Sequence, residues 1–110
     1  MRTNDIVDIF VAYIIKTGGK SRPVLIIKLT DAKVWLLKIT SKYTEKSENI
    51  RKYYYPIFDW EKYNFDKPSY IDTKEYLIAN INDLKITKVR SHFSLTDLKR
   101  LKIFIDNNCQ

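Results

Sequence analysis

The feature that most restricts the fold is a pair of apolar runs joined by a short polar turn. Residues 24–29 and 33–40 have the length of strands and are rich in β-branched, aliphatic and aromatic residues. Asp31 and Ala32 lie between them and form a tight turn. Pro23 fits this reading, because a proline is tolerated at the first position of a strand. We therefore expect two strands paired as a hairpin.

Several shorter segments add to this pattern. Residues 6–13, 53–57 and 69–72 are rich in β-branched or aromatic residues and predict three more strands. Residues 59–63 predict a short helical turn. Residues 41–52 are polar and charged, as expected of an exposed, mobile loop that could carry function.

The C-terminal part of the chain predicts one long helix. Ser94 can cap its free amides, and Asp97 stands three residues on, which is an acidic version of the capping box. The helix should run to about Asp106. The side chains expected to pack on the strands are Leu95, Leu98, Leu101, Phe104 and Ile105, and those expected to face outward are Lys99, Arg100 and Lys102.

Short strands with one terminal helix predict a mainly β fold. We expect a small, strongly bent antiparallel β-barrel with a C-terminal α-helix and short helical turns. At 110 residues the chain has room for a single domain, covering residues 1–110. A net charge of +7 on so small a body favours polyanionic partners such as nucleic acid. The alternative is a basic surface, or a codon bias toward lysine, with no bearing on function.

The cysteine content and the hydropathy pattern suggest an intracellular protein. Cys109 is the single cysteine, so no intramolecular disulfide and no thiolate metal cluster can form, and a reducing cytoplasm fits. No apolar stretch approaches the roughly 18 to 20 residues of a spanning helix. We expect a soluble protein that does not associate with a membrane.

Most enzyme classes lack their residues here. His92 is the one histidine and stands far from any matching cluster, so a metal site is poorly supported and we expect none. No glycine-rich phosphate loop and no nucleophile motif with a partner histidine are present in the sequence. What remains is a basic loop with Lys16, Lys20 and Arg22, the pair Thr40 and Ser41 at a strand end, and an acid-flanked segment, residues 66–72.

Five segments, in order along the chain, resemble one family. Residues 18–27 combine a glycine-containing loop with Arg-Pro and an aliphatic strand, the signature of the PemK/MazF family of bacterial toxins. Residues 4–7 resemble the opening strand of that family, residues 38–41 its strand ending in Thr-Ser, and residues 67–71 a segment of its PemK-like branch. Residues 95–105 stand where the family has its C-terminal helix. The resemblance covers nearly the whole chain.

The resemblance implies a fold, an activity and partners. The fold would be an SH3-like barrel that forms a homodimer. The activity would be cleavage of single-stranded RNA, or mRNA, at selected sequences and without a cofactor. A co-expressed antitoxin would neutralise the protein by placing a disordered tail in the RNA groove, and operator DNA would be reached only through that antitoxin.

The resemblance also assigns roles to residues. The catalytic arginine and threonine of the family match Arg22 and Thr40. An always protonated guanidinium can donate two parallel hydrogen bonds to a phosphate, which suits a reaction in which the 2′-hydroxyl of the RNA is the nucleophile. Proton transfer is left open among Asp66, Asp72 and His92, with Asp66 preferred. The candidate RNA-binding residues are Lys16, Lys20, Ser21, Ser41, Lys42, Arg51, Ser69 and Tyr70.

A second class of function has to be kept beside the first. Small barrels often bind nucleic acid or a partner protein without any chemistry. Taken alone, an arginine before a proline is usually a solvated charge, and Thr-Ser at a strand end is usually a turn former. The alternative is therefore a non-catalytic binding module.

Overall fold

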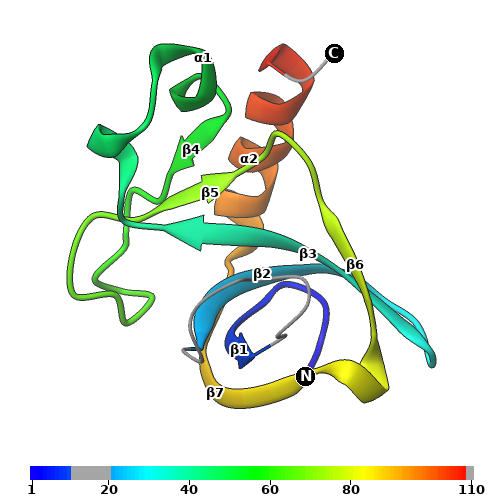
Figure 1. Ribbon diagram of the computed structural model, residues 1–110. Helices are drawn as coiled ribbons and strands as arrows, with labels where there is room; N and C mark the ends of the chain where they lie inside the picture. Colours follow the sequence, from blue (N-terminus) through cyan, green and yellow to red (C-terminus); the bar gives the residue numbers. More distant parts are fainter. Residues whose placement is uncertain (11–20, 109–110) are drawn as a thin grey trace.

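The computed structural model describes residues 1–10 and 21–108, and its main element is an antiparallel sheet of seven strands (Figure 1). The strands are β1 (Asp5–Phe10), β2 (Arg22–Leu29), β3 (Lys33–Thr40), β4 (Tyr54–Pro56), β5 (Tyr70–Asp72), β6 (Leu77–Asn80) and β7 (Lys85–His92). The helical elements are the 3₁₀ helices η1 (Tyr43–Glu45) and η2 (Ile81–Asp83), the short helix α1 (Glu48–Arg51) and the long helix α2 (Leu95–Asn108). The prediction of a mainly β fold with a C-terminal helix and short helical turns is confirmed.

The predicted hairpin forms the middle of the sheet. Strands β2 and β3 pair antiparallel, with Val24 opposite Lys38 and Leu25 opposite Leu37. Val24 belongs to one buried cluster and Leu25 to another, so both faces of β2 are covered. This explains the apolar run over residues 24–27, because the part of a strand that is buried on both faces has no position for a polar residue.

The sheet is bent but not closed. Its strand order is β4-β5-β3-β2-β1-β7, and β6 pairs with the first half of β3 while β5 pairs with its end. Figure 1 shows β2 and β7 bending around β1. Register shifts between β1 and β7 and between β2 and β3 increase such a bend. In the part of the chain that the structure describes, the two end strands of this path do not pair, so the predicted barrel is an open, strongly bent sheet.

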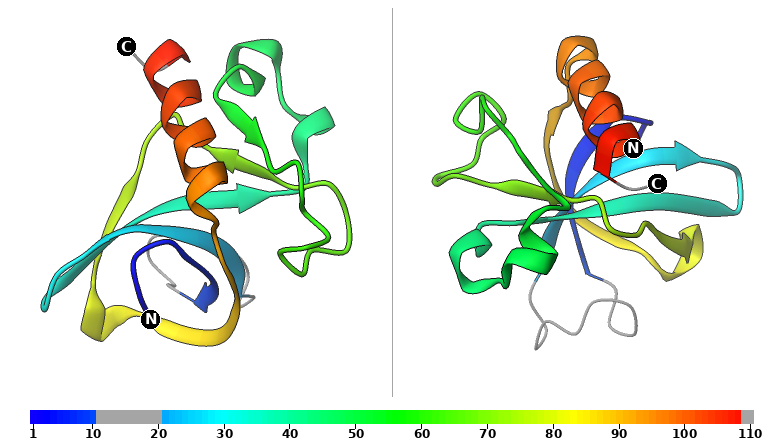
Figure 2. Two further views of the ribbon diagram at one scale, coloured as in Figure 1. Left: turned by 180° about the vertical axis from the view of Figure 1, so that it is seen from behind. Right: turned by 90° about the horizontal axis from the view of Figure 1, so that it is seen from above.

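Helix α2 covers one face of the sheet, and α1 lies on the other side of β3 and β5 (Figure 2). Leu101 is buried, and Leu98, Phe104 and Ile105 pack against the same cluster, as predicted. The basic residues Lys99, Arg100 and Lys102 face outward, also as predicted. The prediction for Leu95 is wrong, because its side chain is 71% exposed in the first turn of the helix.

The start of α2 is fixed by a buried polar cluster. The Asp97 N–H donates to Ser94 Oγ at 3.1 Å, which is the predicted cap. In a capping box the acidic side chain would also accept the Ser94 N–H, but here Tyr63 lies between the two groups. The Tyr63 hydroxyl donates to the Asp97 carboxylate and accepts the Ser94 N–H at 3.0 Å. Tyr63 closes the predicted helical turn, since its N–H donates to the Asp59 carbonyl. This anchor sets the rotation of the helix and leaves Leu95 in solvent.

Replacing Tyr63 by phenylalanine should destabilise the protein by about 1 to 2 kcal/mol. The change removes one hydroxyl, which leaves the part-buried Ser94 N–H without its acceptor and leaves Asp97 Oδ2 with the Ser94 hydroxyl as its remaining donor. Urea unfolding of the wild type and Tyr63→Phe measures the difference. Tyr53→Phe is the matched control, because Tyr53 is only half-buried, and an equal loss in both variants would contradict the role given to the Tyr63 hydroxyl.

Three segments differ from their predictions. The expected loop over residues 41–52 contains η1 and α1 instead, and Tyr43 and Arg51 are partly buried there. Strands β6 and β7 were not predicted, because β7 is almost wholly exposed and lacks an apolar pattern. The predicted strand over residues 6–13 is β1 as far as Phe10, and its last three residues lie outside the described ones.

Candidate active site

The hairpin brings Arg22 and Thr40 together. Arg22 is the first residue of β2 and Thr40 the last residue of β3. Val24 pairs with Lys38, and the same register extended by two residues places Arg22 opposite Thr40. Both residues line two neighbouring cavities, of about 220 Å³ and about 180 Å³. The cavities share Arg22, Ile39 and Thr40, so they are adjacent at this end of the hairpin, and we call the two together the groove.

The groove is strongly basic. The basic residues lining its two cavities are Arg22, Lys38, Lys42, Lys46, Lys67 and Arg90, and the acidic ones are Asp66 and Asp72. Clefts lined mostly by one sign of charge concentrate the opposite charge. The groove therefore favours an anionic ligand.

The side chains of Arg22 and Thr40 can both donate to such a ligand. Within the described residues, the exposed Arg22 guanidinium takes part in no ion pair or hydrogen bond. Thr40 Oγ1 accepts the Lys42 N–H at 3.1 Å, which leaves the hydroxyl proton of Thr40 free to donate outward. Together they can offer a charged fork and a neutral donor to a phosphate.

The first cavity, of about 220 Å³, is walled by residues 65–69. Asp66 lies on this wall with an exposed carboxylate that makes no ion pair or hydrogen bond to the described residues. Ser69 also lies on the wall, but it is buried and its hydroxyl donates to the Lys67 carbonyl at 3.0 Å. Asp66 therefore presents a carboxylate to this cavity, whereas Ser69 shapes the wall.

The second cavity, of about 180 Å³, adds Lys38, Lys46, Tyr54 and Asp72 to the shared residues. Lys38 Nζ lies 3.8 Å from Asp72 Oδ2, and the Lys74 N–H donates to Asp72 Oδ1 at 3.0 Å. Asp72, considered for proton transfer, is thus tied to a neighbouring lysine.

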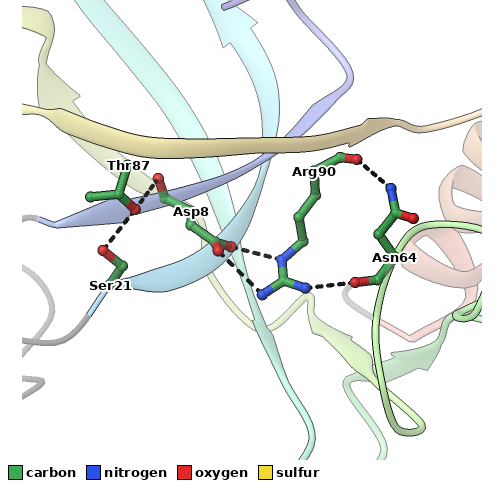
Figure 3. A network of polar contacts seen from close by, with 5 residues as sticks. All are labelled: Asp8, Ser21, Asn64, Thr87 and Arg90. Carbon is green, nitrogen blue, oxygen red and sulfur yellow. Dashed lines mark hydrogen bonds and ion pairs between the residues drawn. The ribbon is translucent and has the colours of Figure 1, made fainter.

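Arg90 was not singled out in the sequence, yet it holds the wall of the groove (Figure 3). Its Nε and Nη2 donate to the two carboxylate oxygens of Asp8 at 2.8 and 3.2 Å. Its Nη1 donates to the Asn64 carbonyl at 2.7 Å, and the Asn64 side-chain amide donates back to the Arg90 carbonyl. Asn64 has φ 66°, a left-handed conformation that asparagine tolerates better than most residues. We call Asp8, Arg90 and Asn64 the clamp, because they join β1 and β7 to the segment that carries Asp66.

His92 lies away from the groove. It lines neither cavity. His92 is the last residue of β7, and its Nδ1 lies 2.9 Å from Asp5 Oδ1. Burial by itself would raise the pKa of Asp5. The hydrogen bonds to His92 and to the Arg2 N–H, together with the charges of those two residues, outweigh burial, so the pKa of Asp5 is lowered. The prediction that His92 handles a proton gains no support from this position.

The lowered pKa of Asp5 predicts an acid-sensitive contribution to stability. A carboxyl with a depressed pKa in the folded state stabilises the protein above its unfolded pKa, and that contribution is lost as the pH falls through the folded pKa. We expect Asp5→Asn to cost about 1 kcal/mol at pH 7, with the difference from the wild type shrinking below about pH 4. Urea unfolding at pH 7 and pH 3 measures it, and a difference that stays constant with pH would contradict the assignment.

The other predicted RNA-binding residues lie at varied places. Ser41 and Lys42 line the first cavity. Ser21 accepts a hydrogen bond from the Thr87 hydroxyl at 2.8 Å, beside the clamp (Figure 3). Arg51 and Tyr70 line neither cavity but contact one tyrosine, Tyr43, next to the groove. Lys16 and Lys20 lie outside the described residues.

A scan against protein-family models and a search of curated proteins find no match. The resemblance to the PemK/MazF toxins therefore depends on the motifs themselves. Among residues 1–10 and 21–108, no three side chains of the His, Cys, Asp and Glu types gather as metal ligands would. None of the described helices has the length and apolar character needed to cross a membrane.

Proposed function

We propose that this protein is an endoribonuclease of the PemK/MazF type, the toxin of a type II toxin-antitoxin pair, which cleaves single-stranded RNA without a metal. The observation that carries the proposal is Arg22 opposite Thr40 in a basic groove with the Asp66 carboxylate on its wall, where neither charged group makes an ion pair or hydrogen bond to the described residues. A structural arginine would be paired, as Arg90 is. An unpaired one in a concave basic site is suited to a phosphate.

The reaction needs little from the protein beyond charge and position. The 2′-oxygen of the RNA forms a bond to the adjacent phosphorus, and the bond from phosphorus to the 5′-oxygen breaks. The products are a 2′,3′-cyclic phosphate and a 5′-hydroxyl. Charge builds up on the non-bridging oxygens during this step, and fixed donors aimed at that charge are the largest single source of rate acceleration in many enzymes.

Each groove residue has a role in this step. Arg22 donates to the non-bridging oxygens, and Thr40 adds a neutral hydrogen bond. Asp66 takes the proton that the 2′-hydroxyl loses, and water at the open side of the groove supplies the proton that the 5′-oxygen gains. Lys42 and Lys67, which line the same cavity, attract the strand on either side of the scissile phosphate.

The partners follow from the same proposal. An acidic antitoxin segment would compete with RNA for the basic groove, and the homodimer of the family would double the number of grooves. The site of action would be cytoplasmic mRNA.

An RNA oligonucleotide with one 2′-deoxynucleotide at the cut position tests the proposal. The protein should cleave the all-ribose strand in EDTA and leave the substituted strand intact, because the deoxy position lacks the nucleophile. Cleavage of both strands would contradict the mechanism. Binding of both strands without cleavage of either would favour the alternative, a non-catalytic nucleic-acid-binding barrel.

A further inference from the structure

A face of three tyrosines borders the second cavity of the groove. Tyr70 pairs with Thr40 across β5 and β3, and Asp72 pairs with Tyr54 across β5 and β4. Directly paired residues on neighbouring strands share a face, and so do residues two apart on one strand. Thr40, Tyr70, Asp72 and Tyr54 therefore point to the same side of the sheet. The intervening residue Ile71 points to the buried core under α2.

Tyr43 of η1 packs onto this face from outside. Its ring stacks on that of Tyr70, with ring centres 4.3 Å apart and planes 12° apart, and lies 6.3 Å from the ring of Tyr54. The Arg51 guanidinium carbon lies 5.6 Å from the Tyr43 ring centre. We call Tyr43, Tyr54 and Tyr70 the tyrosine face. It is an aromatic surface held in place from three separate elements.

The tyrosine face meets the candidate catalytic pair in the second cavity. That cavity is lined by Tyr54 and Asp72 together with Arg22 and Thr40, and Lys46 closes another side. Its volume of about 180 Å³ is comparable with cavities that take one aromatic ring. A flat aromatic ligand could thus lie against tyrosine while an attached phosphate reaches Arg22.

We propose that the second cavity is a nucleobase subsite, in which the base next to the scissile phosphate lies against Tyr54, the member of the tyrosine face that lines this cavity, and Asp72 reads its edge. This inference rests on the proposed ribonuclease function and names a residue that sets its sequence preference. Stacking on an aromatic side chain contributes about a fivefold to hundredfold gain in binding per base. Stacking alone accepts every base, so the choice among bases comes from Asp72.

A carboxylate that only accepts hydrogen bonds selects a guanine. Asp72 has no donor to offer, and its two oxygens retain room for further bonds beside those from Lys38 and the Lys74 N–H. Guanine presents a ring N–H and an amino group side by side, which match two carboxylate oxygens. Uracil presents carbonyl oxygens beside its single N–H, and a carboxylate repels them. Burial, with the charge of Asp72 adding to it, raises the pKa of Tyr54, so the hydroxyl beside Asp72 stays protonated.

The test compares two RNA substrates on two variants. Replacing guanosine by inosine at the base next to the cut removes only the amino group. The wild type should cleave the inosine strand about tenfold more slowly, whereas Asp72→Asn should cleave the two strands at similar rates. Glu75→Gln, which removes an exposed acid outside the groove, should keep the wild-type preference.

Tyr54→Leu provides a second, independent test of the subsite. This variant keeps an apolar side chain but removes the ring, and we expect KM for the guanosine strand to rise about tenfold. Thermal melts of each variant establish that the fold is retained. Suppose that the wild type cleaves RNA, but that inosine slows Asp72→Asn as much as the wild type, or slows neither protein. The subsite is then wrong and the ribonuclease proposal stands. If the wild type cleaves no RNA, both proposals fail together.

Discussion

Arg22→Ala should lower the rate of RNA cleavage about a thousandfold or more while leaving the fold intact. Arg22 is exposed and makes no ion pair or hydrogen bond to the described residues, so its removal breaks none of the polar contacts among them. It would remove the only charged donor that stands opposite Thr40 in the register of the hairpin. Deleting a single donor to a developing oxyanion typically costs a hundredfold to a thousandfold, and a charged arginine at a transferring phosphoryl group costs more.

Two control variants separate the chemistry of Arg22 from its charge. Lys33→Ala removes one positive charge from the other end of the same hairpin and should reduce cleavage less than about twofold at moderate salt. Arg22→Lys keeps the charge but loses the planar fork, and should restore only part of the rate. Thermal melts show whether each variant keeps the fold, and cleavage rates measured beside them show which property of Arg22 the reaction needs. Equal rates for Arg22→Ala and the wild type would remove Arg22 from the active site.

Arg90→Leu should cost about 2 kcal/mol of stability and slow cleavage about tenfold. Arg90 and Asp8 are both largely shielded from solvent, with 21% and 14% of their side chains exposed, so removing the arginine leaves a poorly solvated carboxylate without its partner. The clamp also joins Asn64 to β7, and Asp66 follows two residues later on the wall of the groove. Loosening that wall should displace the carboxylate from the nucleophile.

Arg90 lines the first cavity, but its guanidinium is already paired with Asp8 and Asn64, so we expect the clamp to position the wall and not to contact RNA. We therefore expect kcat to fall while KM changes little, because Arg22 and the lysines that attract RNA are untouched. Asp8→Asn should give a smaller stability loss, and the double variant should lose less than the sum of the two single variants, as expected for residues in one network. Lys88→Leu on the same strand is the control. Additive losses would mean that the pair does not act as a unit.

Local sequence patterns predicted the hairpin and helix α2 because each depends on contacts close along the chain. Arg22 and Thr40 were assigned from the family resemblance alone, and the observed register of the hairpin places them near each other. The position of Leu95 could not be predicted in this way, since the rotation of α2 is set by Tyr63, more than thirty residues away. Strand β7 was missed because it is an exposed strand at the end of the sheet, where β1 is its one partner among the described strands.

The parts of the site that sequence reasoning missed depend on distant contacts. Arg90 meets Asp8 through the pairing of the first and last strands, a separation of 82 residues. The tyrosine face needs β4, β5 and η1 to converge, and nothing in the local pattern marks Tyr43 as different from the other tyrosines. His92 was considered because of its chemical type, but the fold pairs it with Asp5.

The most direct test of the central claim is the chemistry of the cut ends. The purified protein is incubated with a long single-stranded RNA in EDTA, beside Arg22→Ala, and the fragment ends are mapped. We predict discrete cuts by the wild type alone, each with a 2′,3′-cyclic phosphate on one fragment and a 5′-hydroxyl on the other. RNA that stays intact with both proteins, or cuts that appear equally with Arg22→Ala, would contradict a ribonuclease centred on Arg22.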